Sequence, residues 1–392
     1  MAERPFSGVD PVALFGSALA LVGATTLPFV EFRTSRIGIA TYHGIGAAAP
    51  VGYAFLAAVL ACGAVAILTP PRTRGAWLKG VGGVALVALG WALGVAASHL
   101  LAGASSISRV STGGGAWVAL IGIAVVEFAG SQALPSRRAR LAIDAAIAVA
   151  LAAALVLGGA EQLSLAREYA ARADEFWPEV ARHLELAGAG VGFGVLLGVP
   201  LGVLAWRSSS ARRVVLGVVG VIQTIPSLAL IGLLIAPLAA LRVASPLLAN
   251  FGLSGIGTTP AVIALTLYAL LPVVRGTYVG LAEVDPGAIK AGRGMGMSPT
   301  RLLLRVEMPL ALPLLVDGIR TATVLDIGIA SVMFFAGAGG LGVFIFEGVG
   351  QVAPDLTLLG ALPVIVLALI ADALLRALRD ASVSPGLRGE QA

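Results

Sequence analysis

Ten long apolar stretches follow one another along the chain, and they constrain its fold more than any other feature. They lie at 11–30, 51–69, 76–97, 115–133, 141–160, 180–206, 214–240, 258–281, 310–336 and 355–375. A helix needs about 20 such residues to cross a bilayer core of about 30 Å. Only 12% of the 392 residues are charged, against about 25% in soluble domains. We therefore predict an all-α polytopic membrane protein with about ten transmembrane helices.

The positive charges indicate an orientation for these helices. The net charge of +5 could suggest nucleic acid, but the cations lie in short loops between the apolar stretches. With the N-terminus in the cytoplasm, most of them fall on the cytoplasmic side, as the positive-inside rule requires. We therefore predict an inner-membrane protein without a nucleic-acid partner. The single cysteine, Cys62, excludes an intrachain disulfide framework.

A charged connector divides the chain into two parts. We predict an N-terminal five-span region at 1–160, an external connector at 161–179, a second membrane core at 180–378 and a cytoplasmic tail at 379–392. Around the connector, apolar residues recur at helical spacing: Leu165, Tyr169, Ala173, Phe176 and Trp177. This pattern fits an interfacial amphipathic helix. An ordinary solvated connector fits it nearly as well.

The loop 283–309 is the longest polar, cation-bearing interval in the second half. Asp285 before Pro286 predicts a helix N-cap with proline at the first helical position. Gly294 and Gly296 then suit a left-handed end to that helix.

A second short helix is predicted after this turn. Ser298 before Pro299 repeats the start signal, and Pro309 is expected to end the helix. The two helices would carry four cations on a membrane surface: Lys290, Arg293, Arg301 and Arg305. This shape suits docking against another protein.

Two features of the second half predict close packing and a pathway. A strict four-residue glycine repeat predicts a face on which another helix approaches closely; it comprises Gly190, Gly194, Gly198 and Gly202, with Gly188 and Gly192 broadening it. In the next stretch, Pro226 removes one backbone hydrogen bond. Irregular backbone at this depth is tolerated where it lines a watery cavity, so we predict that Gln223, Thr224, Pro226 and Ser227 line a pathway. A simple proline kink is the alternative.

Asp326 lies deep in the ninth stretch, beyond Asp317 and Arg320. An unpaired aspartate near the bilayer centre costs about 2.5–3.5 kcal/mol on insertion scales, so Asp326 should face protein or water. It is a candidate for the pathway, or for a pair with a polar group on a neighbouring span. Glu127 and Asp144 raise the same question in the first half.

The glycine-rich segment that follows matches GxGxxG but lacks the strand and βαβ unit of a dinucleotide site. Gly337, Gly339, Gly340 and Gly342 instead predict a tight external turn where backbone passes closely. The sequence contains no GxxxxGK[ST] phosphate loop and no HExxH motif. We therefore expect no catalytic site, no metal site and no bound cofactor.

The loop 283–309 resembles the EAA motif of ABC-importer permeases. Lys290-Ala291-Gly292 stands at the EAA position, Gly296 at the motif's glycine and Val306–Pro309 at its apolar-proline ending. The sequence departs from the motif at Lys290, at Gly292, and at Val306 and Met308 in the ending. The lysine puts in doubt any particular salt bridge with the ATPase.

A narrower resemblance covers roughly residues 180–378. The segments 223–234, 285–297, 318–324 and 337–342, with His183-Leu184, are similar to the glycine betaine permeases of the ProW and Yeh type. The resemblance implies a five-helix type I permease core in a binding-protein-dependent importer. Its partners would be cytoplasmic ATPase subunits, a second permease subunit, an external binding protein and membrane lipid. The importer would carry a glycine betaine-like osmoprotectant, with ATP hydrolysed on the separate subunit.

The resemblance also implies which residues couple transport to the ATPase. They are Asp285, Pro286, Ala288, Lys290, Ala291, Gly292, Arg293, Gly296, Met297, Val306 and Pro309. A stand-alone ion-coupled secondary transporter remains the alternative, with Asp326, Glu127 and Asp144 as its ion ligands. A DNA-binding helix-turn-helix is disfavoured, because a helix tied between two spans could hardly reach a major groove.

Overall fold

A computed structural model describes residues 8–35, 38–134, 136–250 and 252–382. It divides into two compact units, one up to Ala171 and one from Arg172 onward. Each unit has its own buried apolar core, and each is described by itself below.

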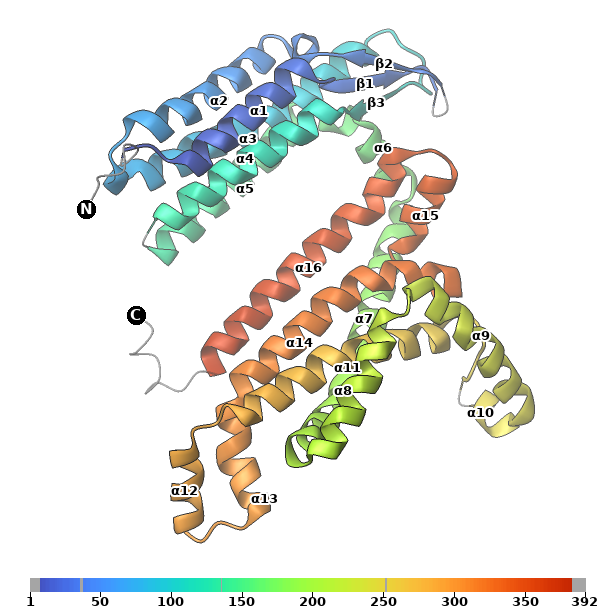
Figure 1. Ribbon diagram of the computed structural model, residues 1–392. Helices are drawn as coiled ribbons and strands as arrows, with labels where there is room; N and C mark the ends of the chain where they lie inside the picture. The colour runs from blue at the N-terminus through green and yellow to red at the C-terminus, as the bar shows by residue number, and fades with distance from the viewer. Residues whose placement is uncertain (1–7, 36–37, 135, 251, 383–392) are drawn as a thin grey trace. The chain divides into compact units, whose positions relative to one another are not determined.

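The N-terminal unit is an antiparallel helical assembly (Figure 1). Its main helices are α1 (Pro11–Thr26), α2 (Val51–Leu68), α3 (Pro71–Leu101), α4 (Gly114–Ala133) and α5 (Arg137–Leu157). Asp10 caps the N-terminus of α1, because its carboxylate accepts hydrogen bonds from the backbone N–H groups of Val12 (3.1 Å) and Ala13 (3.0 Å). Small residues let the helices approach closely: a Cβ on Gly16 of α1 would meet the carbonyl oxygen of Gly122 in α4 at 2.7 Å.

A small antiparallel sheet lies at one end of this unit (Figure 1). Its strand order is β2-β1-β3, formed by β2 (Ala40–His43), β1 (Val30–Arg33) and β3 (Arg109–Thr112). The sequence prediction contained no strands, so this sheet adds three short strands to an otherwise all-α fold. The three strands are four residues each and sit in the connections between helices, where the apolar periodicity used for prediction is absent.

Three charged residues meet between α3, α4 and α5. The Lys79 ammonium group lies 2.9 Å from Glu127 Oε2 and also forms an ion pair with Asp144. Lys79 is almost fully buried, whereas half of the Asp144 side chain is exposed. The sequence did not indicate which residues Glu127 and Asp144 contact. In the structure, both carboxylates form ion pairs with Lys79.

The connector does not form one continuous amphipathic helix. It contains a short 3₁₀ turn, η2 (Ala160–Gln162), and α6 (Ser164–Ala171), and α7 begins at Ala173. Phe176 is buried and stacks on Phe344, with ring centroids 6.1 Å apart, whereas Trp177 is exposed. The predicted apolar stripe is therefore divided between two helices.

The C-terminal unit is built around three packed helices, α7 (Ala173–Arg207), α11 (Thr258–Ala282) and α14 (Met308–Ala330) (Figure 1). The remaining elements are α8 (Ser209–Thr224), α9 (Ser227–Ala244), α10 (Pro246–Asn250), α12 (Pro286–Gly294), α13 (Pro299–Leu302), a π-helical turn η3 (Leu303–Glu307), a 3₁₀ turn η4 (Ser331–Ala336), α15 (Gly342–Gly350) and α16 (Pro354–Ser382).

The four-residue glycine repeat of α7 packs against α11, as predicted. A Cβ on Gly194 would lie 2.5 Å from the Ala269 Cβ, and one on Gly198 would lie 2.8 Å from the Val273 side chain. Gly190 and Gly202 are equally close to Leu265 and Thr277. A Cβ on Gly188 or Gly192 would have no neighbour within 4 Å, so the prediction that these two glycines broaden this face is wrong.

The seventh apolar stretch is two helices and not one kinked span. Helix α8 ends at Thr224, α9 starts at Ser227, and the two run in different directions (Figure 1). Pro226 has no N–H to continue the ladder. The Ile222 carbonyl accepts instead from the Ile225 N–H at 3.1 Å, and the Tyr268 hydroxyl donates to the Ile225 carbonyl.

Eight helices among the described residues are long and apolar enough to cross a membrane. They are Val51–Leu68, Pro71–Leu101, Gly114–Ala133, Arg138–Leu157, Ala173–Arg207, Ser227–Ala244, Thr258–Ala282 and Pro354–Ser382. Helix α1 has only 16 residues. Helix α14 has 23 residues but carries Asp317, Arg320 and Asp326 within its apolar sequence.

Candidate functional site

The loop 283–309 folds into two short helices joined by a tight turn (Figure 1). The Asp285 carboxylate accepts a hydrogen bond from the Ala288 N–H at 3.1 Å, which caps α12 as predicted. Gly296 has φ +76°, a left-handed conformation that glycine adopts without steric cost. The Ser298 hydroxyl accepts from the Arg301 N–H at 3.4 Å and caps α13.

Gly292 is the contact point between the two halves of the loop. It is the buried residue of α12, and a Cβ there would lie 2.5 Å from the Leu302 side chain and 3.5 Å from Met297 Sδ. Val306 approaches the same position at 3.7 Å. A larger residue at 292 would push the two helices apart.

The outer surface of the loop combines positive charge with exposed apolar side chains. Met295 is 70% exposed and Leu304 is 62% exposed. The cations around them are also exposed: Lys290, Arg293, Arg301 and Arg305. Exposed apolar residues rimmed by polar groups are typical of protein docking surfaces.

Pro309 does not end the second helix. The chain continues from α13 through η3 directly into α14, and Pro309 occupies the first turn of α14. The π-helical turn changes the hydrogen-bond register immediately before the proline. Because no backbone N–H is needed at this position, the helix tolerates the N–H that proline lacks. The loop is thereby joined to a core helix without an interruption.

A cavity of about 640 Å³ lies beside the loop, lined by Trp206, Arg207, Arg293, Met297, Pro299, Leu302 and Glu307. Glu307 is 3% exposed. Burial raises the pKa of its carboxyl group above the ordinary value, and the positive charges of Arg293 and Arg207 oppose that rise. The cavity is thus bounded by two cations and one buried acid, a grouping that the sequence did not indicate.

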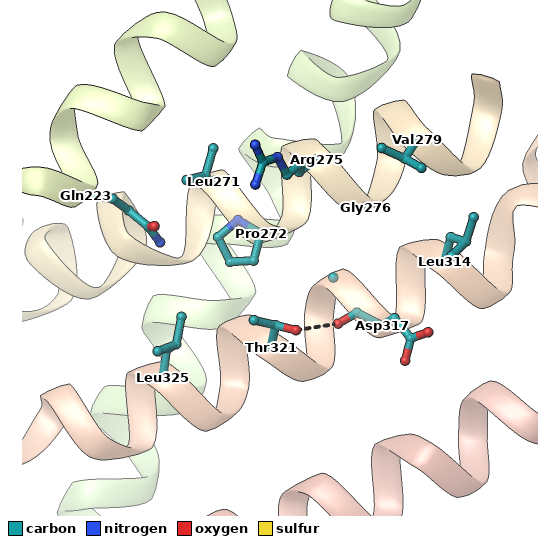
Figure 2. A pocket seen from close by; sticks show the side chains of 11 residues that line it. Gln223, Leu271, Pro272, Arg275, Gly276, Val279, Leu314, Asp317, Thr321 and Leu325 are labelled. Atoms are coloured by element: carbon teal, nitrogen blue, oxygen red, sulfur yellow. Dashed lines mark hydrogen bonds between the residues drawn. The ribbon is translucent and has the colours of Figure 1, made fainter. Parts of the chain in front are cut away.

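A second hollow, of about 380 Å³, lies between α11 and α14 and is called the α11–α14 groove here (Figure 2). Its lining residues are Gln223, Leu271, Pro272, Arg275, Gly276, Val279, Leu314, Asp317, Gly318, Thr321 and Leu325. Two glycines allow the helices to approach at its floor: a Cβ on Gly276 would lie 2.9 Å from the Gly318 Cα. Apolar walls with a few polar groups are the common composition of small-molecule sites.

The predicted pathway residues are placed differently from one another. Gln223 lines the α11–α14 groove, and its side-chain amide donates to the Tyr268 carbonyl at 3.1 Å. The Thr224 hydroxyl bonds back to the Val221 carbonyl at 2.7 Å. Pro226 and Ser227 form the break before α9.

Asp326 lies away from the α11–α14 groove. It is fully buried, and a Cβ on Gly190 of α7 would lie 2.8 Å from Asp326 Oδ2. Neither carboxylate oxygen has a hydrogen-bond partner among the described residues. The Asp326 side chain therefore faces protein, which was one of the two predicted environments, but it does not have the polar partner that was predicted as an alternative.

Among the polar side chains of the groove, Arg275, Asp317 and Thr321 were not predicted from the sequence to line a pathway. The available signal was an arginine followed by glycine and an aspartate followed by glycine, each inside an apolar stretch. Sequence alone could not indicate that these two dipeptides face each other.

The glycine-rich turn is tight and closely packed, as predicted. Gly337, Gly339 and Gly340 all have positive φ. The Gly340 N–H donates to the Glu179 carboxylate, and the Arg182 guanidinium donates to the Ala338 carbonyl at 2.9 Å. The N-terminal part of α7 thus holds this turn in place.

Comparison with known proteins matches each half of the chain to a protein family. The family described as "binding-protein-dependent transport system inner membrane component" matches residues 190–381. The N-terminal domain of the ABC transporter permease YehY matches residues 10–166.

Curated relatives align with the C-terminal half. The osmoprotectant import permease protein OsmW of Salmonella typhimurium (strain LT2) is 41% identical over 207 residues, which are 53% of this chain and 91% of OsmW. The carnitine transport permease protein OpuCB of Listeria monocytogenes is 42% identical over 191 residues, 49% of this chain and 80% of OpuCB. The choline transport system permease protein OpuBB of Bacillus subtilis (strain 168) is 39% identical over 190 residues, 48% of this chain and 80% of OpuBB.

Among solved structures, an inward-facing form of the MetNI methionine ABC transporter matches with a TM-score of 0.47 and 22% identity. The match covers 53% of this chain and 96% of that one. The family assignment rests on the sequence matches. By these matches, the chain belongs to the family of binding-protein-dependent transport system inner membrane components, the permeases of ABC transporters.

Proposed function

We propose that this permease imports a small quaternary-ammonium or zwitterionic osmoprotectant into the cytoplasm. The observation that carries the proposal is the 41% identity to an osmoprotectant permease across 91% of that protein's length. Relatives named for carnitine and choline transport support the same chemical class. These compounds share a bulky cationic group that carries N-methyl groups.

The energy for import would come from a separate cytoplasmic ATPase that binds the loop 283–309. Its exposed cations and apolar residues, Met295 and Leu304, support this docking role. The close packing at Gly292 and the continuous helical connection into α14 support transmission of a rigid-body movement from the loop to the core. The proposed coupling residues remain those that the EAA resemblance implies.

The α11–α14 groove would form this chain's side of the translocation pathway, completed by a second permease subunit. Its open shape and its mixture of apolar and polar lining support that role. Gln223 joins the groove to the α8–α9 break at Thr224, Pro226 and Ser227, whereas Asp326 would act only if the helices separated. An external binding protein would deliver the substrate to the face that carries the glycine-rich turn.

The functional division that we propose assigns transport to residues 180–378, with the loop 283–309 as the ATPase contact. The region 1–160, the connector 161–179 and the tail 379–392 lie outside this part of the chain. The ion-coupled alternative loses two of its candidate ligands, because Glu127 and Asp144 both face Lys79.

The test combines partner capture with uptake. The tagged chain is purified in mild detergent from cells that express its ATPase and binding protein, and labelled glycine betaine uptake is measured in proteoliposomes. We expect the ATPase to co-purify and uptake to need both ATP and binding protein. A chain that purifies alone and transports on an ion gradient would contradict the proposal.

A further inference from the structure

The α11–α14 groove brings two charged residues to one place. Each of them precedes a glycine: Arg275 precedes Gly276 in α11, and Asp317 precedes Gly318 in α14. Because α11 and α14 pack closely at these glycines, both charged residues lie beside this contact, and both line the same hollow. Among the described lining residues, they are the ones that carry formal charge.

The negative charge of Asp317 is compensated by two arginines that do not line the groove. Its Oδ1 lies 3.3 Å from a guanidinium nitrogen of Arg320, and its Oδ2 lies 3.0 Å from Arg379. Figure 2 shows the carboxylate directed away from Arg275. Asp372 of α16 also pairs with Arg320. The aspartate therefore has little negative charge to offer a ligand in the groove.

Arg275 is in the opposite situation. It is exposed, and it makes no hydrogen bond or ion pair with any described residue. It lies within α11, about 10 Å from the end of that helix at 1.5 Å per residue. An arginine within an apolar helix of membrane length needs water or an anionic partner, and such residues typically mark a substrate or ion pathway.

The rest of the groove suits a small molecule with an apolar body. Leu271, Pro272 and Leu325 provide apolar surface near Gln223. The volume of about 380 Å³ lies within the range of about 300–1,000 Å³ for small-molecule sites. A guanidinium binds a carboxylate with paired, charge-assisted hydrogen bonds.

We propose that Arg275 is a substrate-selecting residue, and that it makes the groove accept quaternary-ammonium compounds that carry a carboxylate in preference to simple cations such as choline. This inference rests on the proposed function and narrows its substrate class. The guanidinium pairs with the carboxylate of glycine betaine or carnitine, while the N-methyl groups lie against the apolar wall. Choline has no carboxylate, so the guanidinium repels it and Asp317 does not compensate.

The test measures ligand binding to the purified permease–ATPase complex without binding protein, so that the binding protein's own selectivity does not enter. Saturation-transfer NMR on the N-methyl signal compares glycine betaine with choline. The variants are Arg275→Gln, the conservative Arg275→Lys, and the matched control Arg213→Gln, an exposed arginine of α8 outside the groove. Gel filtration confirms that each complex is assembled.

We expect the wild type and Arg213→Gln to bind glycine betaine at least tenfold better than choline. Arg275→Gln should lose that preference, and Arg275→Lys should keep part of it. Equal signals for the two ligands in the wild type would overturn the inference, as would an unchanged preference in Arg275→Gln. A glycine betaine signal that falls together with the choline signal would also overturn it and would assign Arg275 a structural role between subunits.

Uptake separates this inference from the proposed function. Wild-type proteoliposomes that import glycine betaine with ATP and binding protein support the proposed function, whatever Arg275 does. If the wild type imports no quaternary-ammonium compound, the proposed function fails. If it imports glycine betaine while the binding preference is independent of Arg275, this inference alone fails.

Discussion

The contact between α7 and α11 allows a quantitative test on a single methyl group. Replacing Gly194 with alanine would place a Cβ 2.5 Å from the Ala269 Cβ. Carbon atoms in contact normally lie about 3.5–4.0 Å apart, so the helices would have to separate by about 1 Å or more. Overpacking of this kind costs about 1–3 kcal/mol.

The same helix supplies the control. A Cβ on Gly188 would have no neighbour within 4 Å, so Gly188→Ala gains only the backbone benefit of alanine in a helix, about 0.5–1 kcal/mol. Gly194→Ala gains that benefit too. The difference between the two variants therefore isolates the packing cost, and we expect Gly194→Ala to be less stable by about 1–3 kcal/mol.

Reversible unfolding by SDS in mixed micelles, followed by tryptophan fluorescence, measures these free energies. Exchanging the two residues, Gly194→Ala with Ala269→Gly, moves the methyl group from one helix to the other and should recover most of the loss. The reasoning would be refuted by equal stability of the two single alanine variants, or by an exchange variant less stable than Gly194→Ala.

Three further predictions follow from the structure. Gly296→Val should be strained by about 1–2 kcal/mol, because residue 296 has φ +76°, and this variant should lose the ATPase in co-purification. The control is Gly294→Val, at a helical position where no atom lies within 4 Å of the added Cβ, and it should retain the ATPase. Lys79→Met should leave the largely buried Glu127 carboxylate, whose side chain is 16% exposed, without its charge partner, and should cost about 3–5 kcal/mol. In SDS unfolding, adding Glu127→Gln should recover much of that loss. The raised pKa of Glu307 means that ionisation of its carboxyl group opposes folding. The stability of the wild type relative to Glu307→Gln should therefore fall as the pH rises from the ordinary carboxyl pKa through the raised one. A difference in melting temperature that does not change with pH would contradict this.

Several local structures followed from the sequence because they depend on residues close together in the chain. Asp285 and Pro286 start α12 as predicted, since a cap needs only a side-chain oxygen and the next turn of backbone. The glycine repeat of α7 forms one face because residues four apart in a helix lie nearly in line. Its packing against another helix followed from that face, but the sequence did not name α11 as the partner.

Two other features depart from the sequence prediction, one through an irregular helical turn and one through pairing between distant segments. Pro309 was expected to end a helix, but the π-helical turn before it carries the helix on. The short strands of the N-terminal unit pair residues far apart in sequence, such as Val30 with Thr112. No periodicity within a four-residue segment indicates such a partner.

The sequence by itself determined the class of this protein, because apolar stretches of membrane length and loop cations act independently of how the helices pack. It also determined the capped two-helix loop and the close-packing face of α7, which are written in local spacing. Only the tertiary structure decided which charges are satisfied. Asp317 is compensated by Arg320 and Arg379, whereas Arg275 faces an open groove. That difference depends on which helices cross at Gly276 and Gly318, and hydrophobicity along the chain carries no information about the crossing.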